Sequence, residues 1–206
     1  MSLNSYRGEI IMLSPEFEDF YRSWLQKAEE YEETDLRQCF DKFFTLFVVY
    51  NRLYAEATFT LARKGEINLA TRYSFPDSMA AKSYVQKYLG GANLLSKLED
   101  NEESKQAIAT IRNLIEDGIF NIKLNMVTGN SQREADLELL KSLKSTNRGQ
   151  RARAILDIIY SIRCNMFHGH KGFTPVQVKI LRPVITVLEN IIRALYDKLS
   201  TESTSG

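Results

Sequence analysis

Both histidines of this chain lie in one short stretch, SIRCNMFHGHKGF, which spans residues 161–173. Arg163 stands five positions before the first histidine, His168, and Asn165 lies between them. Histidine exchanges protons near neutral pH, arginine offers a charged planar fork to a phosphate, and asparagine can orient a histidine or a substrate. Together the three side chains form a minimal set for phosphodiester chemistry that needs no metal ion.

The spacing lets these groups converge only at the end of a helix. Arg163 and His168 are about 140° apart around an ideal helix, so they share a face only if the helix ends near His168. Gly169 is typical of such an ending, and Asn165 and His168 lie on one side at a spacing of three. Spacing alone still favours structural roles: an ion pair or helix cap for Arg163, solvation for Asn165 and a bond to a last-turn carbonyl for His168.

Metal and thiol chemistry find little support in the same stretch. Cys164 and His168 are four residues apart and His170 is close, but a structural zinc site takes four ligands and a catalytic one three. Cys39, the other cysteine, lies in an apolar segment with no ligand-type spacing around it. No third group is placed to orient a Cys-His pair, and no glycine-rich phosphate loop is present. The sequence therefore predicts neither a metal nor a cofactor.

Composition predicts a soluble, cytoplasmic protein of one domain. The chain has 206 residues, 44% of them hydrophobic, which is enough for one sizeable core. It contains no apolar run of the roughly 20 residues that span a bilayer and no signal-peptide pattern, so we expect no membrane association. Two widely separated cysteines predict free thiols in a reducing compartment.

The charges are unevenly distributed although the net charge is only +1. Residues 16–35 are predominantly acidic, whereas residues 141–172 contain a single acid, Asp157, among several bases. These bases are Lys141, Lys144, Arg148, Arg151, Arg153, Arg163 and Lys171. A solvated helix face is the usual explanation of such a run, but this one leads directly into the histidine stretch.

The elements that must position this stretch are predicted to be helical. Ser14 and Pro15 should begin a helix over 15–32, and Thr34 should cap a longer aromatic helix that ends at Gly65. Further helices are expected over 77–91, 101–118, 131–145, 148–167 and 174–199, the last with a kink at Pro183. The segment 119–130 fits either a short strand or an extended connection. The fold class is therefore all-α, a single antiparallel helical bundle with a long C-terminal helix.

The segment IRCNMFHGHK resembles the R-x4-6-H signature of the HEPN superfamily, the higher eukaryotes and prokaryotes nucleotide-binding domains. Arg163, four intervening residues, His168, Gly169 and Lys171 carry the resemblance. The aromatic segment 40–54, FDKFFTLFVVYNRLY, and the segment 77–90, DSMAAKSYVQKYLG, are also similar to that family. Cys164 departs from the polar residue that often follows the arginine. The resemblance covers about residues 15–199, which leaves 1–14 as an N-terminal extension and 200–206 as a disordered tail.

The resemblance implies a HEPN-type homodimer in which two motifs face each other and cut RNA without a metal. Arg163 would hold the scissile phosphate, and His168 would act as general acid or base. Asn165, Lys171 and His170 would be supporting or flanking contacts. In a ribonuclease of toxin or phage-defence type, the basic run would guide the RNA backbone. The residues of this run that would contact the RNA are Lys144, Arg148, Arg151 and Arg153.

Two functional classes remain open at this point. One is the endoribonuclease, and the other is a noncatalytic dimerisation module that binds nucleotide or RNA, with a nucleotidyltransferase-like antitoxin as an expected partner. In the second class the same residues hold helix ends together across an interface. The motif is short, so it supports membership of the family better than it supports activity.

Overall fold

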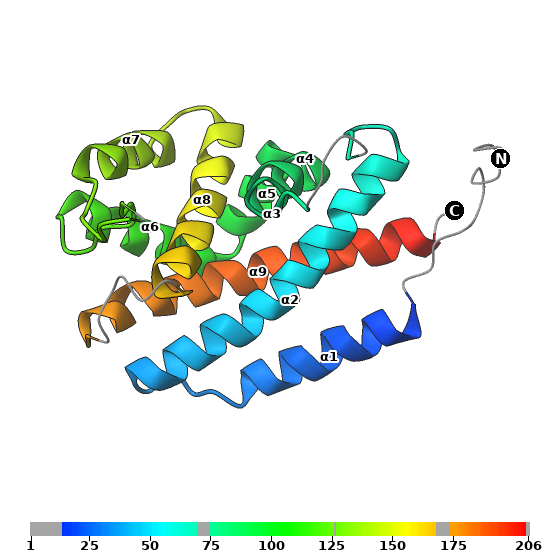
Figure 1. Cartoon of the computed structure of the whole chain (residues 1–206), viewed down its shortest axis with the longest axis horizontal. Coiled ribbons are helices and arrows are strands. Elements are labelled where there is room, and N and C mark those ends of the chain that lie inside the picture. The colour runs from blue at the N-terminus through cyan, green and yellow to red at the C-terminus, as the bar shows by residue number, and fades with distance from the viewer. Residues whose placement is uncertain (1–13, 70–74, 126, 168–173, 205–206) are drawn as a thin grey trace.

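A computed structural model describes residues 14–69, 75–125, 127–167 and 174–204, and these fold into helices joined by short connections (Figure 1). His168, Gly169, His170 and Lys171 lie outside the described residues. The elements in chain order are α1 (Pro15–Glu29), α2 (Leu36–Arg63), α3 (Asp77–Met79), the π-helical turn η1 (Ala80–Tyr84), α4 (Val85–Leu89), α5 (Gly91–Asp100), α6 (Glu102–Glu116), α7 (Arg133–Leu143), α8 (Arg148–Phe167) and α9 (Val176–Thr204). The prediction of an all-α fold is confirmed.

Local capping explains where the first two helices begin. The hydroxyl of Ser14 accepts a hydrogen bond from the backbone N–H of Phe17 at 3.2 Å, as predicted for the start of α1. The cap of α2 is Asp35 rather than the predicted Thr34, because the Asp35 carboxylate accepts the N–H of Gln38 at 2.9 Å. Gly65 follows the end of α2 with φ of +71°, a conformation that glycine adopts without strain.

The two longest helices, α2 and α9, pack side by side and run in the same direction (Figure 1). At one end, Arg182 of α9 donates to the carbonyl oxygen of Glu33, just before α2, at 2.6 Å. At the other end, Lys64 follows α2 and pairs with Glu202 of α9 at 2.7 Å. α1 runs antiparallel to α2, so the antiparallel arrangement predicted from the sequence holds for α1 and α2 but not for α2 and α9.

Glu202 lies beyond the predicted end of the last helix, and its contacts hold it against the fold. Glu202 accepts hydrogen bonds from Lys64 and from the hydroxyl of Tyr88, at 2.7 and 3.2 Å. α9 accordingly continues to Thr204, beyond the expected end at residue 199, and residues 200–204 are helix rather than tail. It also passes through Pro183, which cannot donate a backbone hydrogen bond.

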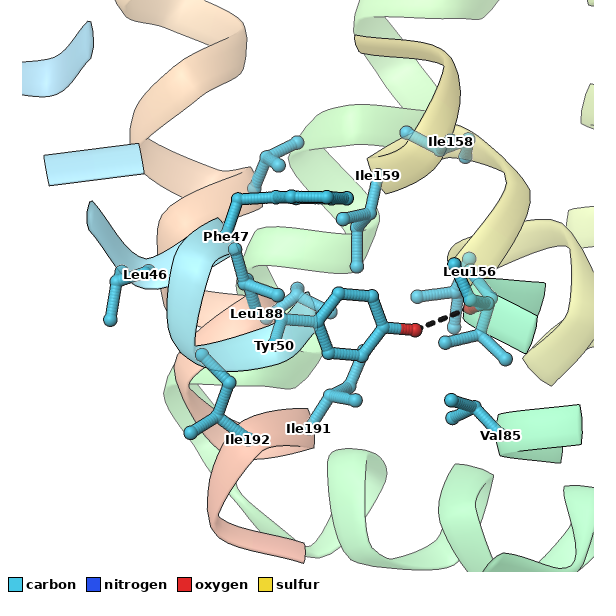
Figure 2. Packing of buried hydrophobic residues seen from close by; sticks show 14 of the residues in the cluster. Leu46, Phe47, Tyr50, Val85, Leu156, Ile158, Ile159, Leu188, Ile191 and Ile192 are labelled. Atoms are coloured by element: carbon cyan, nitrogen blue, oxygen red, sulfur yellow. Dashed lines mark hydrogen bonds between the residues drawn. The ribbon is translucent and has the colours of Figure 1, made fainter. Parts of the chain in front are cut away.

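The core takes residues from nearly every helix, and Figure 2 shows the part around Tyr50, where side chains of α2, α8 and α9 pack together. Tyr50 is 1% exposed, and its hydroxyl donates to the carbonyl oxygen of Ala81 in η1. Figure 2 shows Leu156 and Ile159 of α8 and Leu188 of α9 packed around this ring. A buried phenol is stable only when its hydroxyl has a partner, so this hydrogen bond fixes η1 against the core.

The connection between α6 and α7 is extended, with one isolated antiparallel bridge between Leu124 and Ser131. The fully buried carboxylate of Asp136 accepts the backbone N–H groups of Ile122 and Lys123, the shortest contact being 2.8 Å. Asp136 therefore anchors this connection to α7. No helix in the described part of the chain has the length and apolar character needed to cross a membrane.

Candidate functional site

Arg163 lies just before the last turn of α8, which spans Arg148–Phe167 as the sequence predicted. Its side chain is half-buried, and the guanidinium carbon lies 5.5 Å from the ring centroid of Phe47 and 6.0 Å from that of Tyr160. A cation over aromatic rings is attracted by their negative faces. The two rings thus position the guanidinium at the helix end that leads into residue 168.

Asn165 points into the protein. It is 3% exposed, and its Nδ2 donates to the carbonyl oxygen of Ile122 at 2.7 Å. A small, mostly apolar cavity lies beside it, lined by Phe120, Ile162, Asn165, Met166, Gln177, Ile180 and Leu181. The amide joins the end of α8 to the α6–α7 connection, so its observed contact is structural.

A group of charged side chains meets at Asp157, which lies one to two turns before Arg163 on α8. The Asp157 carboxylate accepts Lys123 on one oxygen at 2.6 Å and Lys82 on the other at 3.2 Å. Lys123 also donates to the Ser161 hydroxyl at 2.9 Å. We refer to Lys82, Asp157 and Lys123 as the Asp157 triad. Burial disfavours the charged carboxylate, but the hydrogen bond and charge of Lys123, with the charge of Lys82, hold the pKa of Asp157 below its usual value.

A second polar group adjoins the triad through Tyr160. The Tyr160 hydroxyl donates to Oδ2 of Asp77 at 2.9 Å, and the Tyr54 hydroxyl donates to Oδ1 of the same carboxylate. Burial and the bond to Asp77 raise the pKa of Tyr160. The ammonium of Lys82 lies 5.2 Å from the Tyr160 ring centroid. Tyr160 therefore contacts both Lys82 and Arg163, and it links the triad to the end of α8.

The π-helical turn η1 carries two side chains that contact α8. A π turn widens the helix locally and is frequent at functional sites. In η1 it presents Lys82 to Asp157 and the Ser83 hydroxyl to Arg153, whose Nη1 donates to it at 2.5 Å. The predicted RNA-binding residue Arg153 therefore lies against η1, one helical turn before Asp157 of the triad.

The other basic residues that were expected to contact RNA form ion pairs within the fold. Lys144 pairs with Glu116 at 2.5 Å. Arg151 and Arg148 both reach Glu99, at 2.5 and 3.6 Å. Arg148 also lies fifteen residues before Arg163, or about 22 Å along an α-helix. Each of these three cations therefore pairs with an acid of α5 or α6 rather than extending the site at Arg163.

Sequence reasoning missed Lys82, Lys123 and Asp77, because the chain positions of these residues give no sign that they meet. One signal was present in α8. Asp157 is the only acid in its basic region, and it falls on a stripe with Arg153, Tyr160 and Cys164 at spacings of four, seven and eleven. Such a stripe shares one helix face, and η1 packs along it.

Among the described residues, no group of three histidine, cysteine or carboxylate side chains is arranged to hold a metal ion. Comparison with known proteins gives no further guide to the site: no protein-family model, no curated protein and no solved structure matches this chain significantly.

Proposed function

We propose that this chain is a HEPN-type, metal-independent endoribonuclease that cleaves RNA at a homodimer cleft through Arg163 and His168. The observation that supports it best is the placement of Arg163. The Arg163 guanidinium lies near the C-terminal end of α8, held by Phe47 and Tyr160, and Arg163 is close in sequence to His168. A guanidinium held in place, close in sequence to a histidine, suits a phosphate whose negative charge increases during reaction.

In the proposed reaction, His168 takes the proton of a ribose 2′-hydroxyl as that oxygen attacks the adjacent phosphorus. The bond from phosphorus to the 5′-oxygen breaks, the proton that His168 took passes to the leaving 5′-oxygen, and a 2′,3′-cyclic phosphate forms. Arg163 stabilises the charge on the non-bridging oxygens, so the step needs no metal. Lys171 and His170 are proposed flanking contacts, and Asn165 supports the site indirectly by fixing the end of α8.

A noncatalytic HEPN-like dimerisation module is the second candidate, with a nucleotidyltransferase-like antitoxin as its proposed partner. The pairing of the predicted RNA-binding cations favours it. Lys144 is neutralised by Glu116, and Glu99 offsets one of the two charges of Arg148 and Arg151. Cations with partners inside the fold attract an RNA backbone less strongly than uncompensated ones.

Cleavage of a mixed-sequence RNA by the purified protein in EDTA distinguishes the two candidates. The ribonuclease proposal expects cyclic-phosphate ends and loss of cleavage in His168→Ala and Arg163→Ala. Arg22→Ala, an exposed arginine on α1, is the matched control and should cleave normally. Cleavage that persists in both motif variants, or no cleavage of several RNAs by a folded wild-type dimer, would leave the noncatalytic module as the better account.

A further inference from the structure

Two half-buried ion triads in this fold have opposite compositions. Lys42 of α2 pairs with two acids, Glu33 at 2.7 Å and Glu189 at 3.2 Å. The Asp157 triad is the reverse, since one acid pairs with two lysines. The first triad therefore carries one excess negative charge, and the second carries one excess positive charge.

The surroundings of the Asp157 triad add to its positive charge. Arg153 and Arg163 lie on the same helix, four residues before and six residues after Asp157. The other neighbouring acid, Asp77, already accepts the hydroxyls of Tyr54 and Tyr160. Lys82 and Lys123 thus pair with Asp157, while Arg153 and Arg163 add two further positive charges along the same helix.

The excess charge is only partly exposed to water, which makes it costly without an anion. The exposed fractions of the Lys82, Lys123 and Asp157 side chains are 19%, 24% and 23%. Partly buried charges are screened less than surface charges, so an uncompensated ammonium here attracts an anion more strongly. Asp157 also holds the two ammonium groups in fixed positions, which reduces the entropy lost on binding.

We propose that Lys82 and Lys123 bind a backbone phosphate of single-stranded RNA that neighbours the phosphate held by Arg163. The inference rests on the proposed function, because Arg163 defines the adjacent subsite. Each ammonium has three donors, and the contacts to Asp157 and Ser161 use only some of them. Tyr160 lies between the two subsites, where it contacts both Lys82 and Arg163.

The test is the salt dependence of binding to a single-stranded oligonucleotide with 2′-O-methyl riboses, which lacks the attacking hydroxyl and so stays intact. For single strands, each lost phosphate contact lowers the slope of log K against log salt by roughly 0.7. Lys82→Gln and Lys123→Gln should each reduce the slope by about this amount and weaken binding several-fold. Lys123→Arg should retain the slope. The exposed Lys105→Gln on α6 is the control and should bind like the wild type.

An unchanged slope in both glutamine variants, with thermal unfolding near that of the wild type, would overturn the subsite, as would a wild type that does not bind. The two proposals fail in different ways. If the lysines set the slope but no RNA is cut, the subsite stands and the nuclease proposal falls. If cleavage requires Arg163 and His168 but neither lysine variant changes the slope, the nuclease proposal stands and the subsite falls.

Discussion

Nδ2 of Asn165 lies 2.7 Å from the carbonyl oxygen of Ile122, a residue 43 positions earlier in the chain. Because Asn165 is 3% exposed, loss of its amide leaves that carbonyl buried without its donor. We expect Asn165→Ala to lower the free energy of unfolding by about 1 to 3 kcal/mol. Urea unfolding measures this, with the exposed Asn113→Ala on α6 as control. A loss no larger than that of the control would show that the hydrogen bond contributes little.

Asp157 makes a pH-dependent contribution to stability. Its folded pKa lies below the ordinary value of 3.8, because its lysine partners outweigh the effect of burial. The contribution is therefore complete above the unfolded pKa and is lost as pH falls through the lower folded pKa. We expect Asp157→Asn to cost about 1 to 3 kcal/mol at pH 7 and progressively less below pH 3.8.

Chemical denaturation of the wild type and Asp157→Asn at several pH values between 7 and 2.5 tests this expectation. The exposed Asp117→Asn serves as the control for the general effect of acid on the fold. A stability difference that stays constant over this range would contradict the assignment of the two lysines as the cause of the shifted pKa.

Asp136 anchors the α6–α7 connection by accepting two backbone N–H groups. Its carboxylate is fully buried, so Asp136→Ala leaves the donors of Ile122 and Lys123 without that acceptor. We expect a loss of about 1.5 to 3 kcal/mol in unfolding free energy. We also expect faster hydrogen exchange at these two amides, whereas Glu134→Gln, an exposed neighbour, should change neither measurement. Protected amides in Asp136→Ala would show that other contacts hold the connection.

Gly91 marks a close approach between the starts of α5 and α8. A Cβ atom added at this position would lie 2.9 Å from the Cα of Gly149 and 2.8 Å from Nε2 of Gln86. The Gln86 side chain can move, but the Gly149 backbone cannot move without shifting α8. Gly91→Ala is therefore expected to destabilise the fold by about 1 to 3 kcal/mol. Thermal unfolding should show a lower Tm than for Ala92→Ser, and equal Tm values would mean that α8 shifts freely.

The sequence predicted best those elements whose signals are local. The 20-residue helix Arg148–Phe167 and the cap at Ser14 match the structure, because caps and apolar spacing act over a few residues. The cap of α2 was misplaced by one residue, since Thr34 and Asp35 are both good capping residues and tertiary contacts decide between them. Glu33 illustrates such a contact, because its carbonyl is held by Arg182, 149 positions away.

Features that depend on distant partners were not predictable. The segment 77–91 was expected to be one helix, but it divides into α3, η1 and α4, and α5 then follows from Gly91. Within η1, the Ala81 carbonyl accepts the hydroxyl of Tyr50, 31 residues earlier in the chain. At the candidate site, Arg163 was identified from its motif, whereas the approach of Lys82 and Lys123 to Asp157 is a property of the packed helices.

The parallel pairing of α2 with α9 has a consequence for how the chain assembles. The contacts that join these helices span 149 residues at one end and 138 at the other. Closing such a loop costs entropy before any contact forms, so this fold should assemble more slowly than helical bundles built from neighbouring segments. During synthesis at about 5 to 20 residues per second, the apolar face of α2 stays without its α9 partner for on the order of 10 s. We therefore expect the newly made chain to be more prone to aggregation before α9 is made than after it.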